Sequence, residues 1–491
     1  MELTLALDAG TTGVRALAYD QAAQPVDEAY RELTQYFPHP GEVEHDPLEI
    51  ARLAVEVLAE VAGRARAAGH EISALGVTNQ RETVLCFDRA GATPVGRALV
   101  WQDRRGAPLC AALRDEGRET LVRATTGLVL DAYFSASKMH WLLAHGAADQ
   151  MEAPAFATID TWLLWWLTGG TNGGVFITEP SNASRTMLLD LDTLNWSPAL
   201  CELFNVERSM LAEVLPSGGH FGRVSAEVVA DLGGVAITGI LGDQQAALFG
   251  QACFSSGVVK ATYGTGAFVL ANTGARPPRP VDGLVTTVAW DLGDGAPVTY
   301  ALEGSAFVAG AAVQWLRDEL HFVTHAHELE ALALTVGDSA GVQFVPAFSG
   351  LGSPFWRPDA RGAITGLSRA SSRAHLARAL VDALAFQVRA ITNAFEVGGV
   401  RLRELRADGG ASAMNSLMQL QATASRVPVL RSGTLEATAR GAATLAGLVS
   451  GRWASLDTLD ELWILDQRFD PEDPTWVEPN YQAWLRACAV A

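Results

Sequence analysis

The sequence predicts a protein of the α/β class that is built from two domains. Short apolar runs typical of strands alternate along the chain with apolar stripes at helical spacing. The chain has 491 residues. Since one hydrophobic core rarely extends beyond about 250–300 residues, this length favours two cores. A similar Gly/Thr turn occurs in each half of the chain, which favours a duplicated domain.

The duplicated feature is a strand–turn–strand hairpin. In the first half, the apolar run 3–7 leads through Asp-Ala-Gly-Thr-Thr-Gly at 8–13 to a return strand at 14–19. In the second half, Lys-Ala-Thr-Tyr at 260–263 leads into Gly-Thr-Gly at 264–266 and another apolar run. The two hairpins predict two similar domains with a cleft between them.

Two long helices are expected, one in each half. Asp46 is a favoured N-cap and Pro47 suits the first helical turn, and apolar residues from 50 to 61 recur on one face. The second helix is expected after Ser371 and Ser372. We place the domain boundary between Gly250 and Gly257, so that residues 1–250 form the first domain and 251–491 the second.

The composition excludes several classes of function. The formal net charge is −19, from 36 basic and 55 acidic residues, which argues against nucleic acid or an anionic membrane as a partner. Lysine occurs only at 138 and 260, and no Gly-Lys-Ser/Thr string exists, which excludes a P-loop. No His-Arg-Asp, Asp-Phe-Gly or Gly-x-Ser-x-Gly string is present, which argues against a protein kinase or a serine hydrolase.

The cysteines and the N-terminus indicate a cytoplasmic protein. The chain has 5 cysteines, an odd number, and no Cys-x-x-Cys string, which favours buried thiols in a reducing compartment. The N-terminus lacks a basic region and reaches an acid at Asp8, so no signal peptide is expected. The most apolar stretch, 161–167, is far shorter than the ~20 residues of a membrane span, so no membrane insertion is expected.

Glycine-rich turns are the first candidate binding motifs. Gly10 and Gly13 allow an anion to approach the backbone, and Thr11 and Thr12 add donors. Asp8 ends an apolar strand and suits a cation such as magnesium. The alternative interpretation is an ordinary hairpin with a capping Asp.

The second half of the chain holds two similar candidates. The turn 264–266 could clamp phosphate, and Asp-Gly-Gly at 408–410 could admit a nucleotide base and ribose against bare backbone. Each is equally well explained as a plain turn. His321, His325 and His327 suggest a metal only weakly, because no Glu-x-x-His string accompanies them.

The candidate catalytic residue is Asp243. It stands in Leu-Gly-Asp-Gln-Gln, where a strand passes into a helix, and the helix dipole and free amides favour its ionised form. An ionised carboxylate suits a general base, and a helix N-cap is the alternative. Arg81 beside Glu82 suits adjacent hydroxyls of a polyol, and Trp101 and Tyr133 could cover its carbon faces. A surface ion pair and core aromatics are the alternative here.

Taken in order, these motifs resemble the FGGY carbohydrate kinases. The likeness runs from about Leu3 to about Trp463. It is strongest, and most similar to the members that phosphorylate glycerol, in five strings: Glu-Val-Glu-His-Asp-Pro at 42–47, Thr-Asn-Gln-Arg-Glu-Thr at 78–83, Asn-Ala-Ser-Arg-Thr-Met-Leu at 182–188, Gly-Asp-Gln-Gln-Ala-Ala-Leu-Phe-Gly at 242–250 and Gln-Trp-Leu-Arg-Asp at 314–318.

The resemblance implies a fold and an activity. It implies two actin/hexokinase-like (ribonuclease H-like) domains, each a mixed five-stranded sheet flanked by helices, with the active site in the cleft between them. It implies ATP-dependent phosphorylation of glycerol to sn-glycerol 3-phosphate, with ATP and Mg²⁺. Homodimers and homotetramers occur in the family. To catalyse phosphoryl transfer, a protein mainly has to position the two reactants and neutralise the charge on the phosphates.

The resemblance also implies residue roles. The polyol would be held by Arg81, Glu82, Trp101, Tyr133, Asp243, Gln244 and Phe268, with Asp243 taking the proton of the attacking hydroxyl. The phosphates would be bracketed by Thr11, Thr12, Gly13, Arg15, Thr265 and Gly266. The nucleoside would be lined by Gly310, Gln314, Gly410 and Met414. Asp8 and Asp243 would face the metal.

Three departures from the family pattern change these expectations. Family members commonly have Ser where Gly13 stands, so one hydroxyl contact to phosphate is missing, although the Gly13 amide remains. Many have Asn where Met414 stands, which implies a looser nucleotide preference. Some are inhibited by fructose 1,6-bisphosphate through a Gly-rich loop ending in Arg, but the stretch 232–237 has no Arg.

Two other functions stay open at this point. One is a kinase for another small polyol or ketose, such as erythritol or dihydroxyacetone. The other is an actin-like nucleotide-binding protein without phosphotransfer, which would not need Arg81, Glu82, Tyr133 and Asp243 together.

Overall fold

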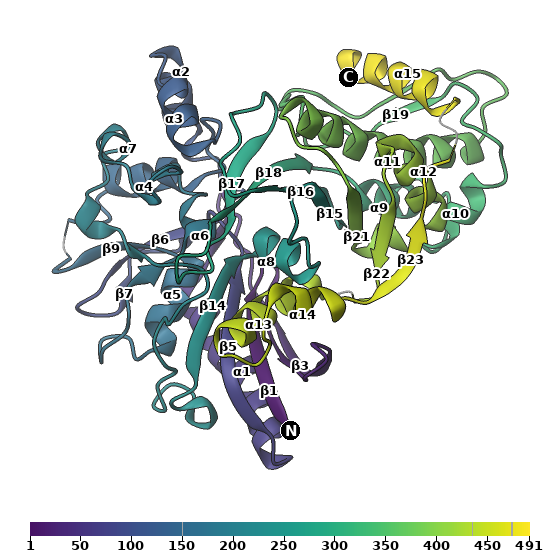
Figure 1. Ribbon diagram of the computed structural model, residues 1–491. Helices are drawn as coiled ribbons and strands as arrows, with labels where there is room; N and C mark the ends of the chain where they lie inside the picture. Colours follow the sequence, from purple (N-terminus) through teal and green to yellow (C-terminus); the bar gives the residue numbers. More distant parts are fainter. Residues whose placement is uncertain (150, 435, 473–474) are drawn as a thin grey trace.

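Two large β-sheets, each with helices packed against it, form the two lobes of the molecule (Figure 1). The computed structural model describes residues 1–149, 151–434, 436–472 and 475–491. Most of the first half of the chain, purple to teal in Figure 1, lies in one lobe, and most of the second half, green to yellow, lies in the other. Among the described residues, no helix combines the length and apolar character that a membrane span requires.

The first sheet is mixed and has five strands, as expected. Its strands in spatial order are β14 (Ala236–Gly242), β5 (Glu71–Asn79), β1 (Glu2–Ala9), β2 (Gly13–Tyr19) and β3 (Pro25–Glu32). β1 is parallel to β5, and β5 to β14, whereas β1, β2 and β3 run antiparallel. The predicted hairpin is therefore confirmed, and its turn lies at the same sheet edge as the carboxyl ends of β5 and β14.

The second sheet has seven strands, and the expectation of five was wrong for this lobe. In spatial order they are β17 (Val285–Trp290), β18 (Thr299–Ala306), β16 (Ala267–Gly274), β15 (Val258–Tyr263), β21 (Glu404–Asp408), β22 (Val429–Ser432) and β23 (Leu465–Phe469). The inner five repeat the pairing pattern of the first sheet. β17 and β23 add one antiparallel strand at each edge.

Shorter strands form smaller sheets that the sequence pattern did not predict. One contains β4 (Glu44–His45), β6 (Val84–Asp88), β7 (Thr93–Pro94), β8 (Ala98–Leu99) and β9 (Pro154–Thr158). The others pair β10 (Ile177–Thr178) with β13 (Glu213–Val214), β11 (Leu189–Asp190) with β12 (Asn195–Trp196), and β19 (Gln343–Val345) with β20 (Ala363–Thr365).

Both long helices predicted from the sequence are confirmed. The Asp46 carboxylate accepts the Leu48 amide at 2.9 Å as the N-cap of α1, and Ser372 is the N-cap of α11, which ends before Gly398. The helices are α1 (Pro47–Ala67), α2 (Ala107–Asp115), α3 (Glu119–Thr126), α4 (Ser135–Ala144), α5 (Ile159–Leu167), α6 (Pro180–Ala183), α7 (Pro198–Leu203), α8 (Asp243–Gly250), α9 (Gly310–Asp318), α10 (Glu328–Ala333), α11 (Arg373–Val397), α12 (Asn415–Ser425), α13 (Ala437–Val449), α14 (Leu456–Glu461) and α15 (Val477–Val490).

Helix α13 comes from the second half of the chain but packs on the first sheet. It lies against β1, β5, β14 and α8 (Figure 1). The backbones of α8 and α13 approach closely where both have glycine: a Cβ on Gly441 would lie 1.8 Å from the Ala246 carbonyl oxygen, and one on Gly250 would lie 1.9 Å from that of Ala437. The predicted division at residue 250 stays a prediction, since α13 crosses back over it.

Substitution of Gly441 by alanine is expected to destabilise the protein. The added methyl group has no space against α8, and overpacking of this kind costs typically about 1–3 kcal/mol. Thermal or urea unfolding measures the loss. Gly337→Ala is the matched control, because no atom lies within 4 Å of the Cβ it would add. Equal stability of the two variants would contradict the close helix crossing.

Candidate active site

The turn between β1 and β2 is held from behind by two glutamines and a histidine. Gln35 Nε2 donates to the Thr11 carbonyl at 2.6 Å, and Gln80 Nε2 donates to the Gly10 carbonyl at 3.1 Å. His45 links them, with Nε2 2.9 Å from Gln35 Oε1 and Nδ1 3.2 Å from Gln80 Nε2. Burial lowers the pKa of His45 to about 4, so its ring is neutral near pH 7 and can accept at one nitrogen while donating at the other.

Thr11, Thr12 and Gly13 form the open end of this turn. Thr12 is exposed and Thr11 is half-buried. The indole of Trp101 donates to Thr11 Oγ1 at 3.0 Å. Gly13 is buried beneath the ring of Tyr30 on β3. The sequence thus correctly predicted a turn with accessible hydroxyls, but it did not indicate the tyrosine beside it.

Asp8 and Arg15 face each other across β1 and β2. Arg15 Nε lies 3.0 Å from Asp8 Oδ2, and Arg15 Nη1 forms a second ion pair with Glu436. Burial raises the pKa of Asp8, against the opposing effect of Arg15. Arg15 therefore pairs with two carboxylates and positions Asp8, and the expectation that it also brackets phosphate stays a prediction.

Asp243 stands at the first position of α8, and Gly242 is the N-cap, so the capping alternative does not hold for Asp243. Its Oδ1 accepts the Gln244 amide at 2.7 Å and lies 3.0 Å from Arg81 Nε. The side chain keeps 29% of its surface exposed. Burial raises the pKa of Asp243, Arg81 lowers it, and the charge of Asp8 raises it, so the two carboxylates lie close enough to interact.

Four buried charges form a closed ring next to Asp243, which we call the charge ring: Arg81, Glu303, Arg185 and Glu82. Arg81 donates from both terminal nitrogens to Glu303, at 2.7 and 3.0 Å. Arg185 Nη2 reaches Glu303 at 3.2 Å, and Arg185 Nε reaches Glu82 at 2.5 Å. Arg81 Nε lies 3.9 Å from Glu82 and closes the ring. Each of these side chains is at most 2% exposed.

The charge ring joins the two lobes. Arg81, Glu82 and Arg185 come from the first half of the chain, and Glu303 lies on β18 of the second sheet. Sequence reasoning predicted Arg81 and Glu82 but assigned nothing to Arg185 or Glu303. Arg185 stands within the quoted string 182–188, so the signal was present, but its role depends on a residue 118 positions away.

Gln244 and Phe268 lie where the second sheet faces α8. Lys260 on β15 donates to Gln244 Oε1 at 2.5 Å. Lys260 pairs in register with Leu270, and Leu270 with Glu303, so these side chains share one face of the sheet. Phe268, two residues before Leu270, points to the same face. Burial lowers the pKa of Lys260, although Asp408, Asp243 and Glu303 oppose that shift.

The two predicted aromatic residues lie together. The rings of Trp101 and Tyr133 meet edge to face with centroids 5.6 Å apart. The guanidinium of Arg185 lies 5.7 Å from the centroid of Tyr133. Trp101 reaches the β1–β2 turn and Tyr133 reaches the charge ring, so these rings connect the two parts of the site.

A cavity of about 580 Å³ lies in the second lobe. It is lined by Thr265, Gly310, Gln314, Gly410 and Met414, which the sequence analysis placed around a nucleotide. Gly266 does not line it; a Cβ there would lie 2.6 Å from the Ala306 carbonyl oxygen, so this glycine lets the hairpin pack against β18. The lining also contains Arg317 and Glu330, to which the sequence analysis gave no role, and His325 and His327, which it considered only as weak metal candidates.

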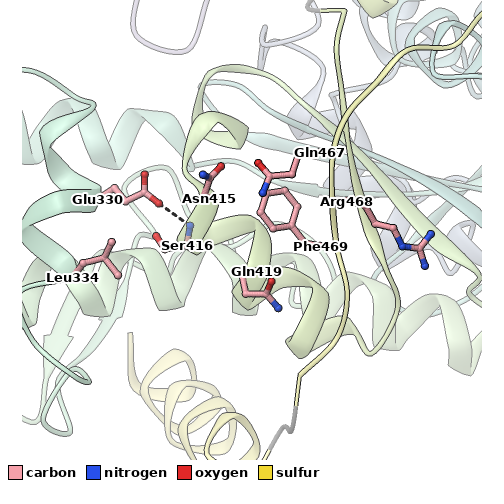
Figure 2. Close-up of a pocket in the computed structure, with 8 residues that line it drawn as sticks. All are labelled: Glu330, Leu334, Asn415, Ser416, Gln419, Gln467, Arg468 and Phe469. Carbon is pink, nitrogen blue, oxygen red and sulfur yellow. Dashed lines mark hydrogen bonds between the residues drawn. The ribbon is translucent and has the colours of Figure 1, made fainter.

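A second hollow of about 540 Å³ adjoins this cavity and shares Glu330 with it (Figure 2). Glu330 Oε1 accepts the Ser416 amide at 2.6 Å, so the carboxylate caps the start of α12 (Figure 2). Glu330 thereby ties α10 to α12 beside Met414. We assign this hollow no ligand.

Comparison with family models identifies the chain. Residues 3–250 match the N-terminal domain of the FGGY family of carbohydrate kinases, and residues 259–449 match its C-terminal domain. The chain belongs to this family. The resemblance drawn from the motifs is confirmed over both lobes of this FGGY protein.

Individual relatives of this FGGY chain cover its full length. A glycerol kinase of Acidovorax ebreus is 47% identical over 501 residues, which span 100% of this chain and 99% of that protein. A glycerol kinase of Citrifermentans bemidjiense is 49% identical, covering 96% of this chain and 95% of that protein. The crystal structure of Plasmodium falciparum glycerol kinase with ADP aligns with a TM-score of 0.94 at 34% identity, over 100% of this chain and 98% of that one.

Because of the charge ring, we expect the unfolding free energy of this FGGY protein to decrease as the pH becomes acidic. Burial disfavours the charged form of Glu303, but Arg185 and Arg81 outweigh it and lower the pKa of this carboxyl from 4.5 to about 2. Because folding lowers the pKa of Glu303, its ionised carboxylate contributes its full stabilisation at pH values above the ordinary pKa of 4.5. This contribution is lost as the pH falls from 4.5 toward 2.

Glu303→Gln tests this expectation. It leaves the arginines without a charged partner, and breaking a buried pair costs about 3–5 kcal/mol. The unfolding free energy of the variant should be lower at pH 7 and should fall less between pH 5 and 3 than that of the unmodified protein. Parallel pH curves for the two proteins would contradict the assignment.

Proposed function

We propose that this chain transfers the γ-phosphoryl group of ATP to glycerol, giving sn-glycerol 3-phosphate and ADP. The observation that carries the proposal is the full-length similarity to glycerol kinases, at 47–49% identity. The site supports it, because Arg81 contacts both Glu82 and Asp243, and a separate cavity in the second lobe is lined by the residues expected to hold a nucleoside.

Glycerol is held by the charge ring and the aromatic pair. Arg81 and Glu82 offer a donor and an acceptor to adjacent hydroxyls. Arg81 Nε makes no well-aligned hydrogen bond within the described residues but lies 3.0 Å from the Asp243 carboxylate, so it links the charge ring to the proposed base. Trp101, Tyr133 and Phe268 cover the carbon chain, and Gln244, oriented by Lys260, bounds the pocket on the side of the second lobe.

Asp243 takes the proton from the attacking terminal hydroxyl. Its carboxylate is kept near Arg81, which favours the ionised form, and is partly open to the cleft. The nucleoside lies against Gly310, Gln314, Gly410 and Met414. The two lobes exclude water, which would otherwise compete with glycerol for the phosphoryl group.

Magnesium fits the residues present. Asp8 and Asp243 are two interacting carboxylates at the same sheet edge, and Mg²⁺ is commonly held by one or two carboxylates together with substrate phosphates and water. Asp8 and Asp243 would hold the ion, and substrate phosphates and water would supply its other ligands. When bound, the ion would neutralise charge on the phosphates.

We further propose a cytoplasmic location and a homodimeric or homotetrameric state. All five cysteines are buried and free, which suits a reducing compartment. Size-exclusion chromatography with light scattering measures the oligomeric state directly.

A panel of acceptors tests the proposed function. ADP release, coupled to NADH oxidation, should give the highest kcat/KM with glycerol, and lower values with dihydroxyacetone and erythritol. A no-acceptor reaction is the control for ATP hydrolysis. If glycerol releases ADP no faster than this control, the proposed function is wrong.

Asp243→Asn tests the catalytic base. The amide cannot accept the proton, and general-base catalysis contributes typically about 10²–10⁴-fold, so kcat should fall by that factor. The KM for glycerol should change far less. Asp382→Asn is a matched control, because Asp382 is also buried and paired, with Arg378 at 2.8 Å in α11. Full turnover by Asp243→Asn would show that another group, or none, acts as base.

A further inference from the structure

The ring of Tyr30 lies over Gly13, at the end of the β1–β2 turn. If residue 13 carried a Cβ, that atom would lie 2.4 Å from both the hydroxyl oxygen and Cε2 of Tyr30. The tyrosine hydroxyl therefore occupies the space that a side chain at position 13 would fill. Glycine at this position is required as long as the ring stays there.

The register of the first sheet puts Tyr30 on the same face as the predicted metal and phosphate groups. Tyr30 pairs with Arg15, and Arg15 pairs with Asp8, so the three side chains project from one face. Tyr30 is 48% exposed, so its hydroxyl is reachable from solvent. A ligand bound at the turn would meet this hydroxyl beside the Gly13 amide.

The Tyr30 hydroxyl is weakly engaged. It donates to the Thr12 carbonyl at 3.4 Å, well beyond the usual distance for an O–H···O hydrogen bond. A phosphate oxygen is a stronger acceptor than a carbonyl, because it carries charge. The hydroxyl proton is thus free to turn to such an acceptor at little cost.

Arg15, which lies on this hairpin, and the two lysines of the chain already have protein partners, which increases the need for neutral donors to a bound phosphate. Arg15 pairs with Asp8 and Glu436. The two lysines of the chain donate to protein oxygens, Lys138 to three backbone carbonyls and Lys260 to Gln244. In a chain of net charge −19, the protein groups that remain for phosphate at this turn, beside the proposed magnesium ion, are amides and hydroxyls.

We propose that Tyr30 is a nucleotide-binding residue whose phenol hydroxyl donates a hydrogen bond to a phosphate oxygen of ATP. The proposal rests on the proposed function, which places ATP phosphates at the β1–β2 turn. Tyr30 thereby supplies, from β3, the hydroxyl that Gly13 lacks.

Tyr30→Phe tests the proposal, because it removes one oxygen and keeps the ring. Binding of ATP and of adenosine is measured without glycerol, by calorimetric or thermal-shift titration. A hydrogen bond to a charged group predicts about tenfold to a hundredfold weaker ATP binding. Adenosine lacks phosphates, so its affinity should not change. Tyr36→Phe, on the neighbouring loop with its ring against Arg97, is the matched control.

A second pair of variants tests the position of the hydroxyl. Tyr30→Ala should weaken ATP binding as Tyr30→Phe does. Adding Gly13→Ser to Tyr30→Ala should recover it, because the serine hydroxyl then enters the space the ring has left. A double variant that binds ATP no better than Tyr30→Ala would count against the proposal.

Two outcomes overturn the proposal: unchanged ATP affinity in Tyr30→Phe, or an equal loss of affinity for adenosine. Failure of the proposed function gives a different result. In that case the unmodified protein binds ATP but does not release ADP with glycerol, and the comparison between ATP and adenosine can still be read.

Discussion

The charge ring of Arg81, Glu303, Arg185 and Glu82 is the interaction on which the site depends. Removing two arginines and two carboxylates from water is costly, and their mutual attraction offsets this only when all four are present and well oriented. Glu303 belongs to the second sheet, so the first lobe cannot complete the charge ring alone. The same contact that joins the two lobes also orients Arg81 and Glu82, the two side chains proposed to receive the substrate.

Most of the fold could be predicted, because its signals are local. The two hairpins are recognised from apolar runs around Gly/Thr turns, and the helices after Asp46 and Ser372 from cap residues and spacing. The two outer strands of the second sheet were missed. β23 is exposed at four of its five residues and joins the sheet only through β22, so no local alternation marks it.

Residues of the candidate site could be predicted where two of them stand side by side in one short string of sequence, as Arg81 and Glu82 do. They could not be predicted where partners come from distant segments: Arg81 and Glu303 are 222 positions apart. Arg15 shows the same limit: its place in the string predicts a phosphate contact, which stays a prediction, but its ion pair with Glu436, far along the chain, could not be read from that string. Tyr30 gives no motif at all, because its relation to Gly13 exists only across two strands.

The close crossing of α8 and α13 limits how far the N-terminal lobe can fold during translation. During synthesis the ribosome delivers residues 1–250 long before residues 437–449. Until then, the surface formed by β1, β5, β14 and α8 lacks its cover, and the apolar side chains under α13 face water. The N-terminal lobe can reach its final packing only after translation is nearly complete, so the earlier intermediate is the species most exposed to chaperones.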